Sequence, residues 1–294
     1  MGVRLEPVFL EGFHGGRRFA LWVTPPEGCP ERGALLCVQP FGEEANLSRR
    51  VIVAQAVRLA AQGWTTLLLD PFGTGDSDGR TDAATLQFWR ADLLRASRLA
   101  RERVAGPFVL WGIRLGALLA AELAIALDQL VSAMIFWQPA SSGAQLMDPL
   151  LKLAKLGAAA RKASGVSPDQ GHASFAAPSD DKSPGDAERI DLAGYRLRRD
   201  LREGLGALSM QPPALGEHSA PCPVLMLGIQ RVLAPGSPAP APLARLAQRW
   251  LDEGYLASLR VVQGEPFWAS LEPSIPAAAF EATETFMESL DARD

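Results

Sequence analysis

The chain has 294 residues, 48% of them hydrophobic, which is enough for one large domain with a substantial core. The net charge is −4, with 29 Lys and Arg against 33 Asp and Glu. The chain therefore lacks the excess of positive charge that binds nucleic acid or anionic membranes. The three cysteines, an odd number without Cys-x-x-Cys spacing, argue against a disulfide framework and against a zinc site.

Targeting signals are not evident in the sequence. Residues 1–7 lack the apolar core of a signal peptide, and no apolar run reaches the roughly 20 residues that a membrane span needs. We therefore expect a cytoplasmic protein without a membrane span.

Strand and helix patterns alternate through the N-terminal half. Residues 4–11 and 17–24 are typical of a β-hairpin that turns on Gly15 and Gly16. The apolar runs that follow predict buried strands at 33–39, 64–70, 108–111 and 131–137. Helical spacing appears between them at 46–62, 82–103 and 118–127. Such alternation predicts a mostly parallel sheet with right-handed crossovers.

The pattern changes after residue 140. Residues 144–162 and 190–208 have helical periodicity, and residues 164–188 between them are rich in Gly, Ser, Pro and Asp, which predicts a mobile excursion. Strands at 224–228 and 258–262 and helices at 241–253 and 276–290 then complete the sheet. We predict a single domain over residues 1–294, with residues 140–220 inserted as a cap.

A tight turn between the strand at 108–111 and the helix at 118–127 has the spacing of a nucleophile elbow. Residues 111–117 read Trp-Gly-Ile-Arg-Leu-Gly-Ala, with glycines on either side of the central position. The central residue is Arg114. A guanidinium stays protonated at neutral pH and only donates hydrogen bonds, so it cannot attack a carbonyl group.

The order of elements and four segments resemble a known family. The hairpin, the crossover strands, the Asp-x-x-Gly-x-Gly-x-Ser turn at 70–77, the elbow and the cap are similar to an α/β-hydrolase. Residues 39–50, 110–120, 137–139 and 266–268 together resemble the exosortase A system-associated hydrolase 2 group. The resemblance implies an eight-stranded, mostly parallel sheet flanked by helices, and exosortase or exopolysaccharide pathway proteins as partners. In that group arginine is usual at the elbow, and histidine is usual at the position of Gln39.

A conventional Ser-His-Asp mechanism lacks its partners in this sequence. The loop after the last strand, residues 263–268, contains no histidine, and residues 229–238 contain no Asp or Glu. His14 lies on the edge hairpin, about 19 Å from the elbow strand at roughly 4.8 Å per strand. His218 precedes a strand, at the wrong edge of the sheet, and His172 lies in the excursion. Ser77 is better explained as a turn residue than as a substitute nucleophile.

Several polar residues are expected at the carboxyl edge of the sheet beside Arg114. Two interpretations remain open. Arg114 either forms an internal ion pair with Glu265 or with Glu43 or Glu44, or it binds an anion together with the amides of Leu115 and the loop at Phe41 and Gly42. Gln138 and Trp268 are expected to lie beside that site. Trp111, Trp137 and Phe267 form either a platform for sugar rings or part of the core, and Arg49 is expected on a solvated helix face.

The sequence thus predicts a pseudoenzyme that binds a small anionic or sugar-acid ligand, without cofactor or metal. One alternative is an esterase or acyltransferase that uses Glu43, Glu44 or Glu265 as general base for a water near Arg114. Another is a scaffold that docks a pathway enzyme through the cap.

Overall fold

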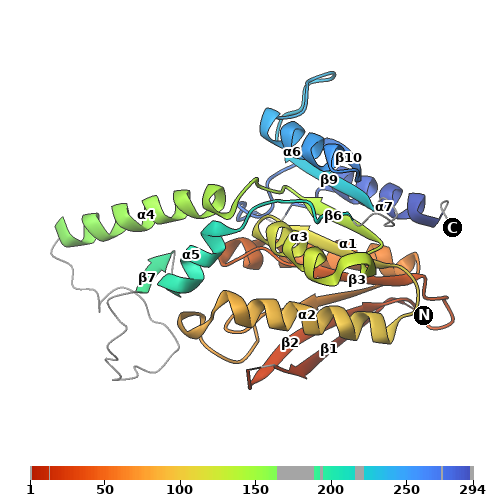
Figure 1. The fold of residues 1–294 in the computed structure, drawn as a ribbon, viewed down its shortest axis with the longest axis horizontal. Helices are drawn as coiled ribbons and strands as arrows, with labels where there is room; N and C mark the ends of the chain where they lie inside the picture. Colours follow the sequence, from red (N-terminus) through yellow and green to blue (C-terminus); the bar gives the residue numbers. More distant parts are fainter. Residues whose placement is uncertain are drawn as a thin grey trace.

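The computed structural model describes residues 2–12, 14–163, 189–192, 195–215, 222–272 and 274–291. An eight-stranded sheet runs through its centre in the order β1-β2-β4-β3-β5-β6-β9-β10 (Figure 1). β2 pairs antiparallel with β1 and with β4, and all other neighbours are parallel. The strands are β1 (Arg4–Glu11), β2 (Arg17–Thr24), β3 (Gly33–Val38), β4 (Trp64–Leu69), β5 (Phe108–Ile113), β6 (Ala133–Trp137), β9 (Pro223–Gln230) and β10 (Leu256–Gln263).

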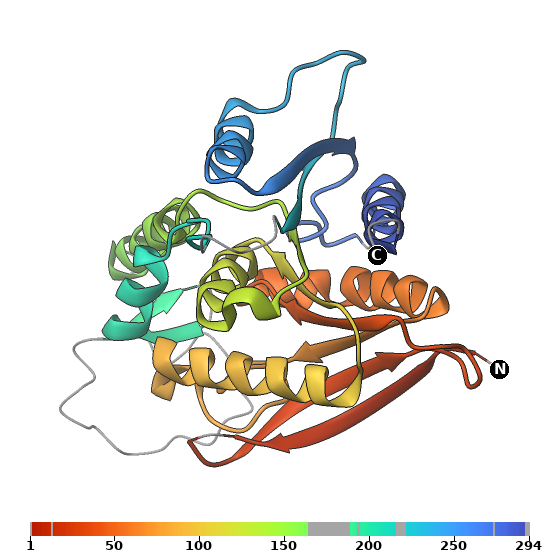
Figure 2. The same cartoon turned by 45° about the vertical axis from the view of Figure 1, so that its right-hand side comes forward.

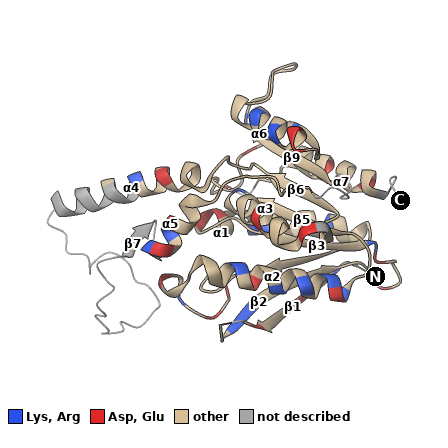
Figure 3. Cartoon of the chain, viewed as in Figure 1, with Lys and Arg blue, Asp and Glu red and all other residues tan. Residues whose placement is uncertain are grey.

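Helices cover both faces of the sheet (Figure 2). The core on one face is built with α2, α3 and α6, and the core on the other with α1 and α7. The central strands β3, β5 and β6 carry no charged residue and are buried throughout, as strands covered on both faces must be (Figure 3). The helices are α1 (Glu43–Ala61), α2 (Leu86–Arg103), α3 (Leu115–Leu127), α4 (Gly143–Ala163), α5 (Arg199–Ala207), α6 (Ala241–Asp252) and α7 (Ala277–Asp291). None of these described helices is both long enough and apolar enough to cross a bilayer.

The predicted fold class is confirmed, with corrections at the level of single elements. α2 begins at Leu86 instead of residue 82, because the Thr85 hydroxyl caps it by accepting from the Phe88 amide at 3.1 Å. α4 begins at Gly143, one residue before the predicted start at 144, and contains Pro149.

The segment that was expected to be helical from residue 190 contains a small hairpin instead. β7 (Arg189–Leu192) pairs antiparallel with β8 (Tyr195–Arg198), and α5 follows. In β8 only Leu197 is buried, between two exposed arginines, and this alternation is the period of a strand. The predicted excursion at 164–188 lies outside the described residues.

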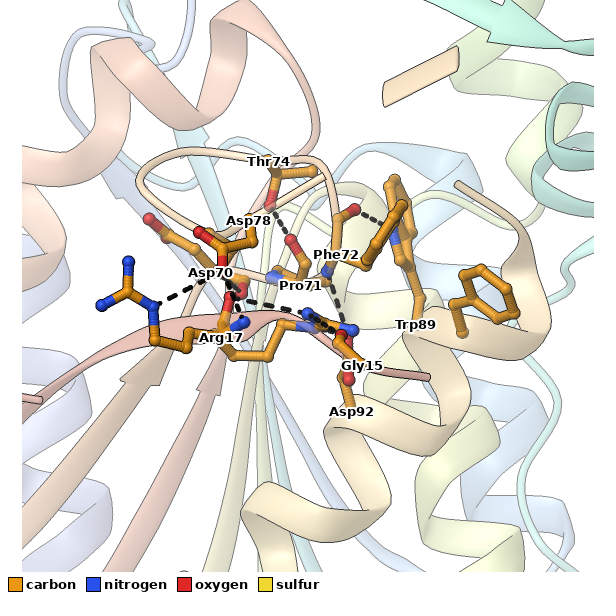
Figure 4. Close-up of polar contacts among 12 residues, drawn as sticks. Gly15, Arg17, Asp70, Pro71, Phe72, Thr74, Asp78, Trp89 and Asp92 are labelled. Atoms are coloured by element: carbon orange, nitrogen blue, oxygen red, sulfur yellow. Dashed lines mark hydrogen bonds and ion pairs between the residues drawn. The ribbon is translucent and has the colours of Figure 1, made fainter. Parts of the chain in front are cut away.

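A buried ion pair fastens strand β2 to helix α2 (Figure 4). Arg18 Nε donates to Asp92 Oδ2 at 2.7 Å, and both side chains are at most 2% exposed. The same Asp92 oxygen accepts from the Phe72 amide at 2.9 Å, so the carboxylate joins β2, α2 and the turn after β4. Two buried charges are tolerated here because each has hydrogen-bond partners.

Candidate functional site

The predicted elbow is present between β5 and α3. Arg114 has φ 57° and ψ −119°, a conformation that costs energy for any residue other than glycine. A Cβ at Gly112 would lie 2.5 Å from the Ala117 Cα, and one at Gly116 would lie 2.1 Å from the Val38 oxygen. Both glycines are therefore required for helix α3 to start so close to strands β5 and β3.

The Arg114 side chain is held by a carboxylate and an aromatic ring. Nη2 donates to Glu44 Oε1 at 2.8 Å and Nε to Glu44 Oε2 at 3.2 Å. The guanidinium carbon lies 5.2 Å from the centroid of the Trp268 ring, within cation–π range. The Arg114 side chain is 19% exposed, so solvent still reaches it. Nη1 has no partner among the residues that the structure describes.

Of the carboxylates predicted to pair with Arg114, only Glu44 does so in the described part of the chain. The Glu265 carboxylate accepts from Arg231 Nε at 2.8 Å instead, because both side chains extend from the loops that follow the neighbouring strands β9 and β10. Of the alternatives that the sequence left open, Arg114 therefore pairs with Glu44 and not with Glu265. Glu43 Oε2 accepts from Asn46 Nδ2 at 3.1 Å, within helix α1.

Two backbone amides near the elbow lack a hydrogen-bond partner in the described part of the chain. The amides of Phe41 and Leu115 donate to no other residue in the described ranges. Leu115 is the first residue of α3, where amides have no partner within the helix. Gly42 adopts φ 63° at the start of α1, and this turn leads from Phe41 into the helix that carries Glu44.

Strand β8 packs against the loop that precedes α1. The Tyr195 ring of β8 lies 5.8 Å from the Phe41 ring between centroids, and its hydroxyl accepts from Asn46 Nδ2 at 2.9 Å. A Cβ at Gly42 would touch the same ring at 3.5 Å. Burial raises the pKa of the Tyr195 hydroxyl.

Gln138 takes part in the sheet edge. It has φ 47°, its Oε1 accepts from the Ile229 amide at 2.7 Å, and its own amide donates to the Leu227 oxygen at 2.7 Å. The side-chain oxygen is thus engaged in joining β6 to β9.

A second buried carboxylate, Asp70, was not identified from the sequence. Its Oδ1 accepts from Arg49 Nη2 at 2.8 Å and from Gln39 Nε2 at 3.0 Å, and its Oδ2 accepts from the Asp76 amide at 3.1 Å. Arg49 is therefore an ion-pair partner of Asp70, and its side chain, 35% exposed, still lies partly in solvent as expected. The sequence signal that could have identified this ion pair is an Asp directly after a buried apolar strand. A carboxylate in that position is buried and needs a counter-charge.

The described residues bring no triad together. The ring of His14 stacks on Phe88 with centroids 4.0 Å apart, on the edge hairpin and away from the elbow. The Ser77 hydroxyl accepts from the Phe19 amide at 2.8 Å and donates to the Asp70 carbonyl oxygen, which is the predicted turn role. His172 and His218 lie outside the described ranges. Across those ranges no three His, Cys, Asp or Glu side chains are grouped as metal ligands would be.

The aromatic residues near the elbow belong mainly to the core. Trp111 and Trp137 are 0% exposed and Phe267 is 2% exposed, so none of them offers a face to a sugar. The Trp137 indole donates to the Thr283 hydroxyl at 3.0 Å and packs edge-on against Trp111. Trp268 keeps 8% exposure and is the aromatic residue that contacts Arg114.

Comparison with known families and structures supports the fold. The profile of the family described as serine aminopeptidase, S33, matches residues 30–187, more than half of the 294-residue chain. A search of curated proteins found no match.

Solved structures with the same architecture are esterases and hydrolases. Est1E from Butyrivibrio proteoclasticus, with bound ferulic acid, is 18% identical, with a TM-score of 0.64 over 97% of this chain and 99% of its own. A highly thermostable carboxyl esterase from Bacillus coagulans, in complex with glycerol, is 14% identical, with a TM-score of 0.64 over 99% of both chains. A serine hydrolase without lid from Xanthomonas campestris is 14% identical, with a TM-score of 0.55 over 97% of this chain and 94% of its own. At these identities the similarity shows the α/β-hydrolase fold alone.

Proposed function

The chain belongs to the serine aminopeptidase S33 family, and from this premise we propose that its elbow binds a small carboxylate ligand without hydrolysing it. The observation that carries the proposal is the side chain of Arg114 at the position of the nucleophile, ion-paired at 2.8 Å with Glu44. A guanidinium supplies no attacking electron pair, whereas it recognises carboxylates well.

Three donor groups are available for such a ligand. Nη1 of Arg114 has no partner among the described residues, and the amides of Phe41 and Leu115 are equally without one. Donors of this kind stabilise an oxyanion in hydrolases of this fold, and the N-terminus of α3 adds a favourable field. A carboxylate that accepts from Nη1 and from one amide leaves the pair of Arg114 with Glu44 intact.

The ligand class is narrowed by two further points. Trp268 lies beside the guanidinium and is 8% exposed, and an aromatic side chain at this place suits a ligand in which a ring carries the carboxylate. The resemblance to the exosortase A system-associated hydrolase 2 group supports a sugar acid of an exopolysaccharide as that ring. A structural neighbour, Est1E, holds ferulic acid, which is also a carboxylic acid.

Isothermal titration calorimetry of the protein with glucuronate tests this proposal. Glucose, which has the same ring without the carboxylate, is the control ligand. We expect glucuronate to bind, glucose not to bind, and Arg114→Gln to abolish binding. Arg231→Gln is the matched control, because this arginine is paired with Glu265 on a neighbouring loop and is not part of the proposed site. Equal binding of glucuronate by the wild type and Arg114→Gln would refute the proposal.

Other functions lead to other outcomes. An esterase with Glu43, Glu44 or Glu265 as general base would hydrolyse short-chain esters and lose that turnover in the corresponding Glu→Gln variant. Glu44 and Glu265 are each tied to an arginine, which disfavours this role. A scaffold that docks through the cap would keep its partner in Arg114→Gln and lose it when residues 144–208 are removed.

A further inference from the structure

The two edges of the sheet differ in how well they are protected from pairing. β1 contains Pro7 and the charged residues Arg4, Glu6 and Glu11. Proline and charges on an edge strand prevent another strand from adding to it. β10, at the other edge, has no proline and only one charged residue, Arg260, along its eight residues.

The free edge of β10 presents backbone groups that point away from the sheet. The amide of Leu256 donates to the Cys222 oxygen at 3.2 Å and that of Gly264 to the Gln230 oxygen at 2.8 Å, both toward β9. Backbone groups alternate in direction along a strand, so residues 257, 259, 261 and 263 point their amides and carbonyls outward. These amides have no partner among the described residues.

Apolar side chains are exposed around this edge, beside a shallow hollow. A shallow hollow of about 380 Å³ beside the strand is lined by Leu259, Val261 and the loop at 233–239. Nearby, Leu256 is 43% exposed, Leu251 44% and Val232 80%. Figure 2 shows the loop between β9 and α6 extending away from the body of the molecule at this edge.

We infer that β10 pairs antiparallel with β10 of a second copy of this chain, which extends the sheet across a twofold axis. An antiparallel partner of identical sequence satisfies the outward amides and carbonyls of both strands at once. The side chains of the partner's strand then fill the hollow beside Leu259 and Val261.

The sequence of β10 selects the register of this pairing. Two residues that lie directly opposite each other in an antiparallel pair must both have their backbone groups directed toward the partner strand, or both away from it. The twofold axis therefore passes between one residue of β10 and the same residue of the second copy. An axis at Arg260 sets two like charges against each other, which is unfavourable. With the axis at Val261, only the five residues 259–263 of each strand lie opposite each other. With the axis at Leu259, the seven residues 256–262 do so. The last register is therefore favoured, and it places Arg260 opposite Ser258 of the second copy.

Sedimentation velocity of the full chain over a dilution series tests this inference. We expect a dimer in the wild type and a monomer in Ala257→Pro, because this variant removes an outward amide and no bond to β9. The matched control is Leu5→Pro on the other edge. A proline within an edge strand directs its nitrogen away from the sheet, as Pro7 does, and the Leu5 amide, two residues earlier, has the same direction. Leu5→Pro therefore removes no bond to β2, and we expect this variant to remain dimeric. Circular dichroism verifies that both proline variants are folded.

A second variant tests the register without proline. Ser258→Asp places a carboxylate opposite Arg260 of the second copy, and we expect its dimer dissociation constant to fall about 2- to 30-fold, since the twofold axis creates two such pairs. Ser258→Lys should raise the constant. A monomeric wild type, or a dimer that Ala257→Pro leaves unchanged, would overturn the inference, and unchanged constants in both Ser258 variants would overturn the register.

Discussion

Arg114 at the elbow donates from Nη2 to Oε1 of Glu44, 70 residues earlier in the chain, across 2.8 Å. This bond ties the turn after β5 to the first turn of α1 at the point where related hydrolases need an attacking oxygen. An internal ion pair thus occupies the nucleophile position, and in the proposed function an anion accepts from Nη1 and from one of two backbone amides.

Glu44→Gln should lower the free energy of unfolding by about 1 kcal/mol, because a partly buried guanidinium loses its counter-charge while keeping one hydrogen bond. The ion pair is partly open to solvent, with side chains 19% and 28% exposed, so a larger loss is not expected. Urea unfolding measures the change. Glu43→Gln, an exposed residue in the same helical turn, should change stability by less than about 0.5 kcal/mol. Equal losses in both variants would contradict this account of the pair.

Arg18→Met should cost about 3–5 kcal/mol, because it leaves the Asp92 carboxylate buried without its cation. The double variant Arg18→Met with Asp92→Leu should recover much of that loss, since both charges are then replaced by apolar groups. Arg17→Gln serves as the control, as Arg17 pairs with Asp78 at the surface, where the side chains are 62% and 44% exposed. Urea unfolding of the four proteins tests this prediction, and an equal loss in Arg18→Met and Arg17→Gln would disprove it.

Stability should fall in alkaline solution through Cys222. Burial raises the pKa of this thiol from 9.0 to about 12. The unfolded chain therefore loses the proton near pH 9 while the folded chain retains it, so the stabilisation is complete below pH 9 and is lost as the pH rises toward 12. Between neutral pH and pH 10.5 the wild type should lose about 2 kcal/mol more than Cys222→Ala. Parallel pH profiles of the two proteins in urea unfolding would contradict this prediction.

The fold and the elbow could be predicted because their signals are local. The fully apolar strands β3, β5 and β6 and the glycines at 112 and 116 are requirements of single segments, and each is evident in a few consecutive residues. The character of Arg114 also follows from its chemistry alone, whatever its surroundings.

The partners of the site residues could not be predicted because they depend on how distant loops meet. Three carboxylates were candidates for Arg114, and the choice of Glu44 rests on the start of α1 at Glu43 and on Arg231 occupying Glu265. The pairing of Arg49 with Asp70 likewise joins a helix to the end of a neighbouring strand. Such contacts are set by side-chain directions in the folded chain, which spacing does not encode.

The most direct test of the central claim is a crystal structure grown with glucuronate. We expect the ligand carboxylate to accept from Arg114 Nη1 and from the amide of Leu115 or Phe41, with the Glu44 pair retained and no covalent bond to the protein. A carboxylate bound elsewhere with the elbow empty, or an acyl group attached to a side chain near Arg114, would contradict it.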